Sequence, residues 1–470
     1  MGRKKKKQIL HQVKFHGIAD RGKGVGRTED GRVVFADKAV PGDVADVLVS
    51  KKRKGFFMGR VIEFHQYSPD RIPHFCEHFG TCGGCKWQYL DYDAQLKHKD
   101  QVVRDALQRI GKVDVTAFQE IIGAPTTTFY RNKLEFSFSN KRWLTPEELS
   151  QEEISNKKDV LGFHPAGAFD KIIDIQKCWL QPEPSNELRN GIRDLAHQQG
   201  LSFYDARAHE GVMRTMMLRI TSLGEVLLLL AFGEDEPEKI QHFLDAVVEQ
   251  FPQVTSLYYC INTKLNDFMM DLPMELHHGK DHVEEKLGSV RFKIGPKSFF
   301  QTNTEQAKTL YDVVVEYADL QGHENVYDLY TGLGSIALYI ANNCKQVVGI
   351  EEIEAAIIGA RENAILNQID NSIFYAGDVK DILTAEFANK HGKPDVLITD
   401  PPRAGMHPGV VKMLLELEAP KLVYVSCNPA TQARDIQLLS EKYQVDRIRP
   451  VDMFPHTHHI ESVALLNLKK

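Results

Sequence analysis

The sequence predicts an α/β protein with a doubly wound, mostly parallel sheet in its last third, a small β-barrel at its N-terminal end and an α+β unit between them. The first observation is the alternation of apolar, strand-like runs with helix-compatible segments from residue 325 onward. The second is a series of short β-prone runs, separated by Gly and Asp turns, up to Ile62. The third is a mixture of β-runs and short helices before the alternating region. We therefore expect three domains, at residues 1–66, 67–290 and 291–470.

The composition is that of an ordinary globular protein. The 470 residues are enough for two or three domains, and 42% hydrophobic with 26% charged residues is typical of soluble proteins. No stretch resembles a membrane span, and the basic start, Arg3–Lys7, is not followed by an apolar signal segment, which predicts a cytoplasmic protein. Seven cysteines in such a compartment indicate metal binding or catalysis more than disulfides.

The formal charge is distributed unevenly along the chain. Residues 1–60 contain sixteen Lys and Arg against six acidic residues, a net charge of +10, whereas the remainder carries −16. A basic head on an acidic body indicates an anionic partner. Within the head, Gly22–Arg27 and Lys51–Phe57 interleave cations with glycine or aromatic residues, a pattern that suits phosphate contact and base stacking. A plain solvated basic loop is the alternative.

Four cysteines form a candidate metal site. Cys76, Cys82 and Cys85 cluster in a glycine-rich turn, and the isolated Cys178 follows much later. Three clustered thiols and one distant thiol can supply the corners of a [4Fe-4S] cluster. Structural zinc is the competing interpretation, although zinc ribbons usually bring two close pairs. We favour the cluster, with the role of clamping loops of the central domain together.

A helix is predicted at Asp91–Gly111, because its apolar residues recur on one side. We expect that side to pack on the last domain. Lys99 lies away from the apolar side in this pattern. Two further cysteines, Cys260 and Cys344, lie inside apolar runs, and we interpret both as core residues.

Polar side chains follow two strands of the predicted parallel sheet. The apolar run Leu422–Val425 stops just before Cys427, and Pro429 is typical of a first helical turn. Asp400 ends the preceding strand. Two prolines follow it, and because proline has no backbone N–H, they cannot continue the hydrogen bonding of the strand. Because the carboxyl ends of such strands face the ligand crevice, we expect Cys427 and Asp400 to share one site. A helix N-terminus beside Cys427 would favour its thiolate, although a lone cysteine is more often a small core residue.

A glycine turn, Tyr330–Gly334, follows the first strand of this sheet. Glycines allow the backbone to approach a bound ligand closely. Glu351 closes the next strand, at about the distance expected of a ribose-binding carboxylate. The turn alone would fit a dinucleotide-dependent oxidoreductase as well. Asp378 ends the third strand, where capping a helix is one interpretation.

Together these motifs resemble the uracil-5-methyltransferases of RNA, the RumA/TrmA family. The similarity rests on the segments around Cys427, 400–405, 328–334 and 454–461, and it extends in order over essentially the whole chain. One departure is Thr331, where family members often have a cysteine. The resemblance implies a Rossmann-like class I methyltransferase domain that uses S-adenosylmethionine, an N-terminal TRAM domain, which is an OB-like RNA-binding barrel, and a central α+β iron-sulfur domain.

The resemblance also implies roles for individual residues. Cys427 would attack carbon 6 of uracil, and Glu461 would remove the proton from carbon 5. A solvated Glu461 is the alternative, but its apolar flanks suggest burial. The cofactor would contact Gln301, Tyr330, Gly332, Glu351, Asp378 and Asp400. For Gln301, the alternative is a loop residue that only satisfies backbone hydrogen bonds. The [4Fe-4S] ligands would be Cys76, Cys82, Cys85 and Cys178. RNA would contact Arg131, Lys133 and Arg403, and a surface ion pair is an equal alternative for Arg131 and Lys133. The histidines His456, His458 and His459 suit stacking or orientation more than metal binding.

The target RNA is the least defined part of the prediction. The cysteine set and the basic head favour 23S rRNA, modified by a monomeric enzyme. Transfer RNA is the alternative substrate. A non-catalytic RNA-binding assembly factor is the alternative function, but it would leave Cys427 and Glu461 without a role.

Overall fold

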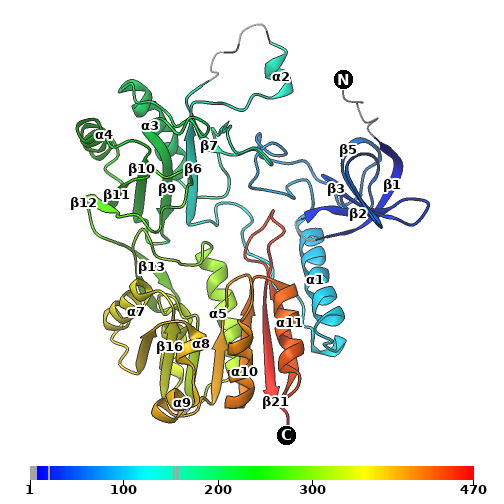
Figure 1. Cartoon of the computed structure of the whole chain (residues 1–470), viewed down its shortest axis with the longest axis vertical. Helices are drawn as coiled ribbons and strands as arrows, with labels where there is room; N and C mark the ends of the chain where they lie inside the picture. The colour runs from blue at the N-terminus through cyan, green and yellow to red at the C-terminus, as the bar shows by residue number, and fades with distance from the viewer. Residues whose placement is uncertain (1–7, 20–21, 152–153, 155–157) are drawn as a thin grey trace.

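The computed structural model describes the chain except for residues 1–7, 20–21, 152–153 and 155–157. The basic run Arg3–Lys7 therefore lies outside the described residues, as do Asp20 and Arg21. Three β-structures make up most of the molecule. Figure 1 shows a barrel in blue, a central sheet in green and a third sheet, yellow to red, below both.

The N-terminal barrel is closed by five strands in the order β1-β2-β3-β5-β4. The strands are β1 (Ile9–Ile18), β2 (Gly24–Arg27), β3 (Val33–Asp37), β4 (Val44–Arg53) and β5 (Phe56–Gln66). The last three were expected. Strand β1 is not predicted by the sequence pattern, because a bulge between Leu10 and Val13 interrupts the alternation of apolar and polar residues. Strand β2 lies in the glycine-rich segment predicted to contact phosphate, with a solvated loop as the alternative, and glycine is uncommon within strands.

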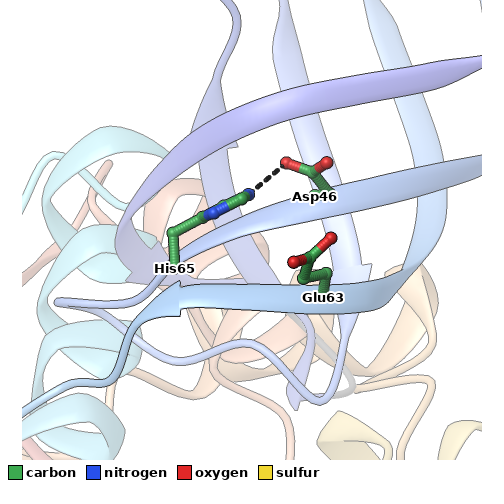
Figure 2. Close-up of side chains that lie close together, drawn as sticks. All are labelled: Asp46, Glu63 and His65. Carbon is green, nitrogen blue, oxygen red and sulfur yellow. Dashed lines mark hydrogen bonds and ion pairs between the residues drawn. The ribbon is translucent and has the colours of Figure 1, made fainter.

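One outer face of the barrel carries a hydrogen-bonded group of titratable side chains. Asp46, Glu63 and His65 have ligand-type atoms within 4.8 Å of one another, and Figure 2 shows the bond between Asp46 and His65. Asp46 accepts hydrogen bonds from His65, from His11 and from the backbone N–H of Gln12. Burial alone would raise the pKa of Asp46, but these hydrogen bonds outweigh it and lower the pKa to about 2. The group therefore ties β1, β4 and β5 together.

The central sheet has seven strands in the order β12-β11-β10-β9-β6-β7-β8. Its strands are β6 (Lys133–Ser139), β7 (Val160–Phe163), β8 (Ile173–Asp174), β9 (Met213–Ile220), β10 (Val226–Phe232), β11 (Ser256–Ile261) and β12 (Glu275–Gly279). Helices α3 (Ser185–Gln198) and α4 (Pro237–Gln250) share one apolar core with it. Short helices lie at η2 (Val115–Ala117) and α2 (Pro146–Leu149). Strands β6 to β11 lie at β-prone runs of the sequence before the alternating region, and β12 is a further strand that the pattern does not predict.

The C-terminal sheet has seven strands in the order β17-β16-β15-β18-β19-β21-β20. The strands are β15 (Asn325–Leu329), β16 (Gln346–Glu351), β17 (Ser372–Ala376), β18 (Val396–Thr399), β19 (Lys421–Ser426), β20 (Tyr443–Val451) and β21 (Glu461–Leu468). The first five are parallel, and β21 runs antiparallel between β19 and β20. The predicted doubly wound, mostly parallel sheet is confirmed, and an antiparallel β20–β21 hairpin forms one edge.

Helices cover both faces of this sheet. They are α5 (Thr304–Ala318), α6 (Ser335–Ile340), η3 (Ala341–Asn343), α7 (Glu354–Leu366), α8 (Val379–Ile382), α9 (Ala385–His391), α10 (Pro408–Leu417) and α11 (Pro429–Leu439). The hairpin β13 (Val283–Leu287) and β14 (Val290–Ile294) packs into the same core. Cys344 lies in that core as expected, and so does Cys260 from the central sheet.

Helix α1 (Tyr92–Arg109) packs against α11, and its residues Val103 and Leu107 join the core of the C-terminal sheet. Lys99 is fully buried, which the sequence pattern did not predict. Its ammonium group donates to Asp452 at 2.6 Å and to the carbonyl of Phe454. The buried carboxylate explains how a lysine is tolerated there.

Candidate active site

The strand register brings Cys427 and Glu461 to the same end of the sheet. Strands β19 and β21 are antiparallel, and Ser426 pairs with Ser462. Cys427 is the next residue beyond this pair on one strand, and Glu461 is the next on the other. Asp400 follows β18, the parallel neighbour of β19, so it joins the same edge. The expectation that Cys427 and Asp400 share a site agrees with this arrangement.

Two carboxyl groups at this edge, the buried Glu461 and the partly buried Asp400, hold protons more tightly than usual. Glu461 is 5% exposed, and burial followed by the charge of Asp400 raises its pKa well above the ordinary value. Burial, followed by the charge of Asp328, raises the pKa of Asp400 to about 7. A cation entering this space would offset the repulsion between the carboxylates. The site is therefore electrostatically suited to a positively charged ligand.

Cys427 is partly exposed, as a nucleophile must be, but its environment does not favour the thiolate in the way the sequence suggested. Burial, Glu461 and Asp400 raise its pKa to about 12, and Arg403 opposes them only partly. The predicted helix N-terminus is present, since α11 begins at Pro429. There Asn428 already accepts the N–H of Ala430. Burial, followed by the two nearby carboxyl groups, outweighs the partial charge of the helix end.

The glycine turn between β15 and α6 is braced by two carboxylates. Asp328 accepts the hydroxyl of Thr331 and the N–H of Ala337, while one of its buried oxygens has no hydrogen-bond partner in the described chain. Glu351 accepts the N–H groups of Gly332 and Ile353. These bonds fix the shape of the turn.

The turn leaves room for a ligand at one glycine. Gly332 has a φ of 56°, and a Cβ added to it would meet no atom within 4 Å. The same addition at Gly334 would press on Phe374 and Ala360. Tyr330 is also left-handed, with a φ of 65°, an unusual conformation for an aromatic residue that is typical of functional turns.

Two other predicted cofactor residues have clear local roles. Asp378 is the N-cap of α8, accepts the N–H of Lys380 and forms an ion pair with that lysine, so the capping interpretation is confirmed. The carbonyl of Gln301 accepts a hydrogen bond from Asn132, which joins the loop before α5 to the central sheet. The N-cap of α5 is Asn303, whose side chain accepts the N–H of Gln306.

The predicted RNA contacts lie on two sides of the catalytic loop, residues 452–460 between β20 and β21. Arg403 approaches His459 at 3.5 Å, and its carbonyl accepts the side-chain amide of Asn428. Arg131 lies 5.7 Å above the ring of Phe454 in that loop. Lys133 pairs with Glu135 at 2.8 Å, which was the alternative considered for it.

The four cysteines expected to bind metal line one cavity of about 430 Å³. Burial raises the pKa of all four thiols, to about 11 for Cys82 and about 12 for Cys85. Within the described chain, no three of these sulfur atoms lie within 4.8 Å of one another. Tetrahedral zinc would require about 3.8 Å between sulfurs, given Zn–S bonds of about 2.3 Å. As they stand, these sulfur atoms are therefore too far apart to be the ligands of one tetrahedral zinc ion.

Two residues near the site were given no role in the sequence analysis. Asp328 belongs to the segment 328–334, in which the sequence assigns it no separate role. Its position just before the glycine turn could have indicated a carboxylate that accepts hydrogen bonds from the turn. Tyr311 is buried, bonds Ser335 at 3.0 Å, and its pKa is raised first by burial and then by Asp400, Asp328 and Glu461. It lies on the apolar face of α5 with Leu310 and Val314, so the sequence pattern marks it only as an ordinary core residue.

Comparisons with known proteins agree with this geometry. Residues 273–469 match the tRNA (Uracil-5-)-methyltransferase family, and residues 11–62 match the TRAM domain. An uncharacterized RNA methyltransferase of Bacteroides thetaiotaomicron is 50% identical over 455 residues, covering 96% of this chain and all of that one. One of Porphyromonas gingivalis is 50% identical over 456 residues, covering 96% of this chain and 98% of that one.

A solved structure extends the comparison to three dimensions. The tRNA (uracil-54, C5)-methyltransferase of Pyrococcus abyssi, in complex with S-adenosyl-L-homocysteine, is 28% identical with a TM-score of 0.75, covering 97% of this chain and 100% of that one. Within the described part of this chain, no helix has the length and apolar character to cross a membrane. The chain belongs to the S-adenosylmethionine-dependent RNA uracil-5-methyltransferase family, and it carries the TRAM domain at its N-terminal end.

Proposed function

We propose that this RNA methyltransferase modifies carbon 5 of a uridine in 23S rRNA, with Cys427 as the nucleophile and Glu461 as the base. The observation that supports these roles most directly is the β19–β21 register, which sets the two residues side by side at the ligand edge of the sheet. Asp400 and Arg403 would complete the uracil pocket. A base within a paired RNA would have to be flipped out to enter it.

The first step is covalent addition to the pyrimidine. Carbon 5 of uracil is a weak nucleophile, because its electrons are conjugated within a neutral ring. The Cys427 sulfur forms a bond to carbon 6, which breaks the conjugation and leaves an enolate with electron density on carbon 5. S-Adenosylmethionine supplies the methyl group as an electrophilic sulfonium. Carbon 5 would bond to that methyl group as the methyl–sulfur bond breaks and S-adenosylhomocysteine leaves, and carbon 5 would then carry both a methyl group and a proton.

The second step restores the aromatic pyrimidine. Glu461 removes the proton from carbon 5, the electrons of that C–H bond form the carbon 5–carbon 6 double bond, and the Cys427 thiolate leaves. The raised pKa of Glu461 makes its carboxylate a stronger base than an exposed glutamate. Its burial at 5% exposure also keeps bulk water away from the proton transfer.

The residues at the turn are chemically suited to the cofactor. The turn at Gly332 would allow close approach of the backbone, and Glu351 would offer its carboxylate to ribose hydroxyls. The buried Asp328 oxygen without a partner and the carboxyl of Asp400 would favour a cationic ligand. Tyr330 and Gln301 would border the same space, with Asp378 at its rim.

We also infer that Cys76, Cys82, Cys85 and Cys178 hold a [4Fe-4S] cluster. Cluster binding would remove the thiol protons, which burial otherwise holds in place. The cluster would join the loop before α1 to the loop before α3. No redox step is required of it.

The choice of 23S rRNA rests on the basic barrel and the cysteine set. Transfer RNA is the second candidate, because the solved relative from P. abyssi is named as a tRNA (uracil-54, C5)-methyltransferase. Mapping 5-methyluridine in both RNAs of a deletion strain would decide between them. Loss of the modification only from tRNA would overturn the choice of 23S rRNA.

The covalent mechanism is tested with RNA that contains 5-fluorouridine. Fluorine at carbon 5 cannot leave as a proton does, so the reaction should stop at a covalent RNA–protein adduct that survives denaturing electrophoresis. We expect this adduct with the native protein and S-adenosylmethionine, and none with Cys427→Ala. An adduct that persists in Cys427→Ala would overturn the assigned nucleophile.

A further inference from the structure

Three aromatic side chains form a partly exposed cluster beside the cysteine cavity. The ring of Trp179 lies 5.6 Å from the ring of Phe75 and 5.6 Å from that of Phe129. Phe75 is 39% exposed and Phe129 is 37% exposed. Folded proteins usually bury such rings, so neighbouring exposed aromatics indicate a binding surface. We call Phe75, Phe129 and Trp179 the aromatic platform.

The backbone at Phe129 is held in an unfavourable conformation that keeps its ring at this surface. Its φ is 55°, a left-handed value that bulky residues rarely adopt. The N–H of Phe129 donates to the carbonyl of Trp179 at 2.7 Å, which fixes the strained residue against the platform. Strain of this kind persists where the surrounding structure enforces it, and it is frequent at binding sites.

Cations accompany the rings. The Lys177 ammonium lies 3.8 Å from the centre of the Trp179 ring, and Arg131 lies above the ring of Phe454. Lys177, Trp179 and Arg131 line the cavity of the four cysteines together with Lys133. Proteins that bind single-stranded nucleic acid combine aromatic rings with Lys and Arg, because the rings stack on bases and the cations contact phosphates.

The platform is continuous with the candidate active site. Phe75 contacts the ring of His456 at 5.2 Å, edge to face, and Thr457 lines the same cavity as Trp179. Both His456 and Thr457 belong to the catalytic loop that leads into Glu461. A nucleotide on the platform would therefore adjoin the RNA strand that enters the active site.

We propose that the aromatic platform is a stacking site for unpaired RNA nucleotides that flank the target uridine, and this inference rests on the proposed function. Two of its rings are sequence neighbours of the proposed metal ligands. Phe75 directly precedes Cys76, and Trp179 directly follows Cys178. A metal held by these cysteines would fix the two rings in place. The site would select RNA with unpaired neighbours on either side of the uridine over a continuous duplex.

The test uses the full-length protein and a fluorescent oligouridine, with an RNA duplex of the same length as competitor. Phe129→Asn removes the ring with a residue that tolerates the left-handed backbone. The matched control is Phe268→Asn, because Phe268 is likewise an exposed phenylalanine, 60% exposed, but lies in a different loop. We expect Phe129→Asn to weaken oligouridine binding by about tenfold, the effect of losing one stacked base, and Phe268→Asn to have no effect. Equal binding by Phe129→Asn and the native protein would overturn the proposal.

A second measurement locates the contact directly. Oligouridine that contains 5-iodouridine is irradiated on the protein, and the crosslinked peptides are identified by mass spectrometry. Crosslinks at Phe75, Phe129 or Trp179 support the platform, whereas crosslinks confined to the barrel overturn it. The Cys427 adduct with fluorouridine RNA tests the proposed function separately. Platform crosslinks without that adduct would refute only the mechanism, and the adduct without platform crosslinks would refute only this inference.

Discussion

Lys99 and Asp452 form a fully buried ion pair of 2.6 Å between α1 and the end of β20. Lys99 also donates to the carbonyl of Phe454, so one ammonium group anchors the start of the catalytic loop. Glu461 lies at the other end of that loop. The orientation of the proposed base therefore depends on a helix that lies more than three hundred residues earlier in the sequence.

This pair predicts a large effect from removing one partner. Lys99→Met leaves the Asp452 carboxylate buried without its cation, and we expect it to destabilise the fold by about 3–5 kcal/mol. Combining it with Asp452→Asn should recover part of the loss, because the uncompensated charge is gone. Thermal unfolding of the two variants measures this. The control is Lys97→Met, because Lys97 is two residues earlier on the same helix and is exposed. An equally large loss of stability in that variant would contradict the explanation.

Cys427→Ala should abolish methyl transfer while leaving cofactor binding intact. Removing a covalent nucleophile typically lowers kcat by several orders of magnitude. The measurement is transfer of a labelled methyl group to RNA, beside calorimetric titration with S-adenosylhomocysteine. Cys260→Ala, which removes a core thiol, should keep its activity. Methyl transfer by Cys427→Ala at more than background would refute the nucleophile.

Glu461→Gln should separate the two halves of the reaction. The variant can still add Cys427 to carbon 6 and accept the methyl group, but it has no base for the proton on carbon 5. A methylated covalent complex should therefore accumulate on unmodified RNA, visible by denaturing electrophoresis. Glu441→Gln, an exposed change of the same kind, should turn over normally. Normal turnover by Glu461→Gln would show that another group takes the proton.

The reactivity of Cys427 should respond to its charged neighbours in opposite directions. Burial contributes most to its raised pKa, followed by Glu461 and Asp400, while Arg403 lowers it. Above pH 7, where Asp400 is ionised, Asp400→Asn should lower the thiol pKa and speed alkylation by iodoacetamide. Arg403→Gln should slow it. The rate is followed on the Cys427 peptide by mass spectrometry across pH 7 to about 10, and the same sign of change in both variants would contradict this electrostatic account.

Anaerobically purified protein should contain iron and sulfide at about four of each per chain, as a [4Fe-4S] cluster requires. It should show a broad visible absorption that dithionite bleaches. Cys178→Ser should lose most of this iron, although Cys178 is distant in sequence from the other three ligands. Cys344→Ser is the control, since that thiol is buried elsewhere. Stoichiometric zinc in place of iron would overturn the cluster assignment.

Much of the fold was predictable because burial follows local periodicity. The strands that end before Asp400 and Cys427 are short apolar runs, and a parallel strand that is buried on both faces produces such a run wherever it lies. Apolar runs of this kind mark the five parallel strands of the C-terminal sheet, β15 to β19. It failed at β1, where a bulge changes the alternation, and at β2, where glycines replace the β-prone residues that a strand usually shows.

The sequence by itself determined which residues are candidates for chemistry, namely the thiol, the acids and the four cysteines, since these are properties of residue type and spacing. Only the tertiary structure decided how they act on one another. The insertion of β21 beside β19 sets Glu461 opposite Cys427, and burial, followed by the two carboxyls there, raises the thiol pKa that the helix end alone would have lowered. Electrostatic interactions depend on distance in space and on burial, and neither is encoded in the local pattern around any one of these residues.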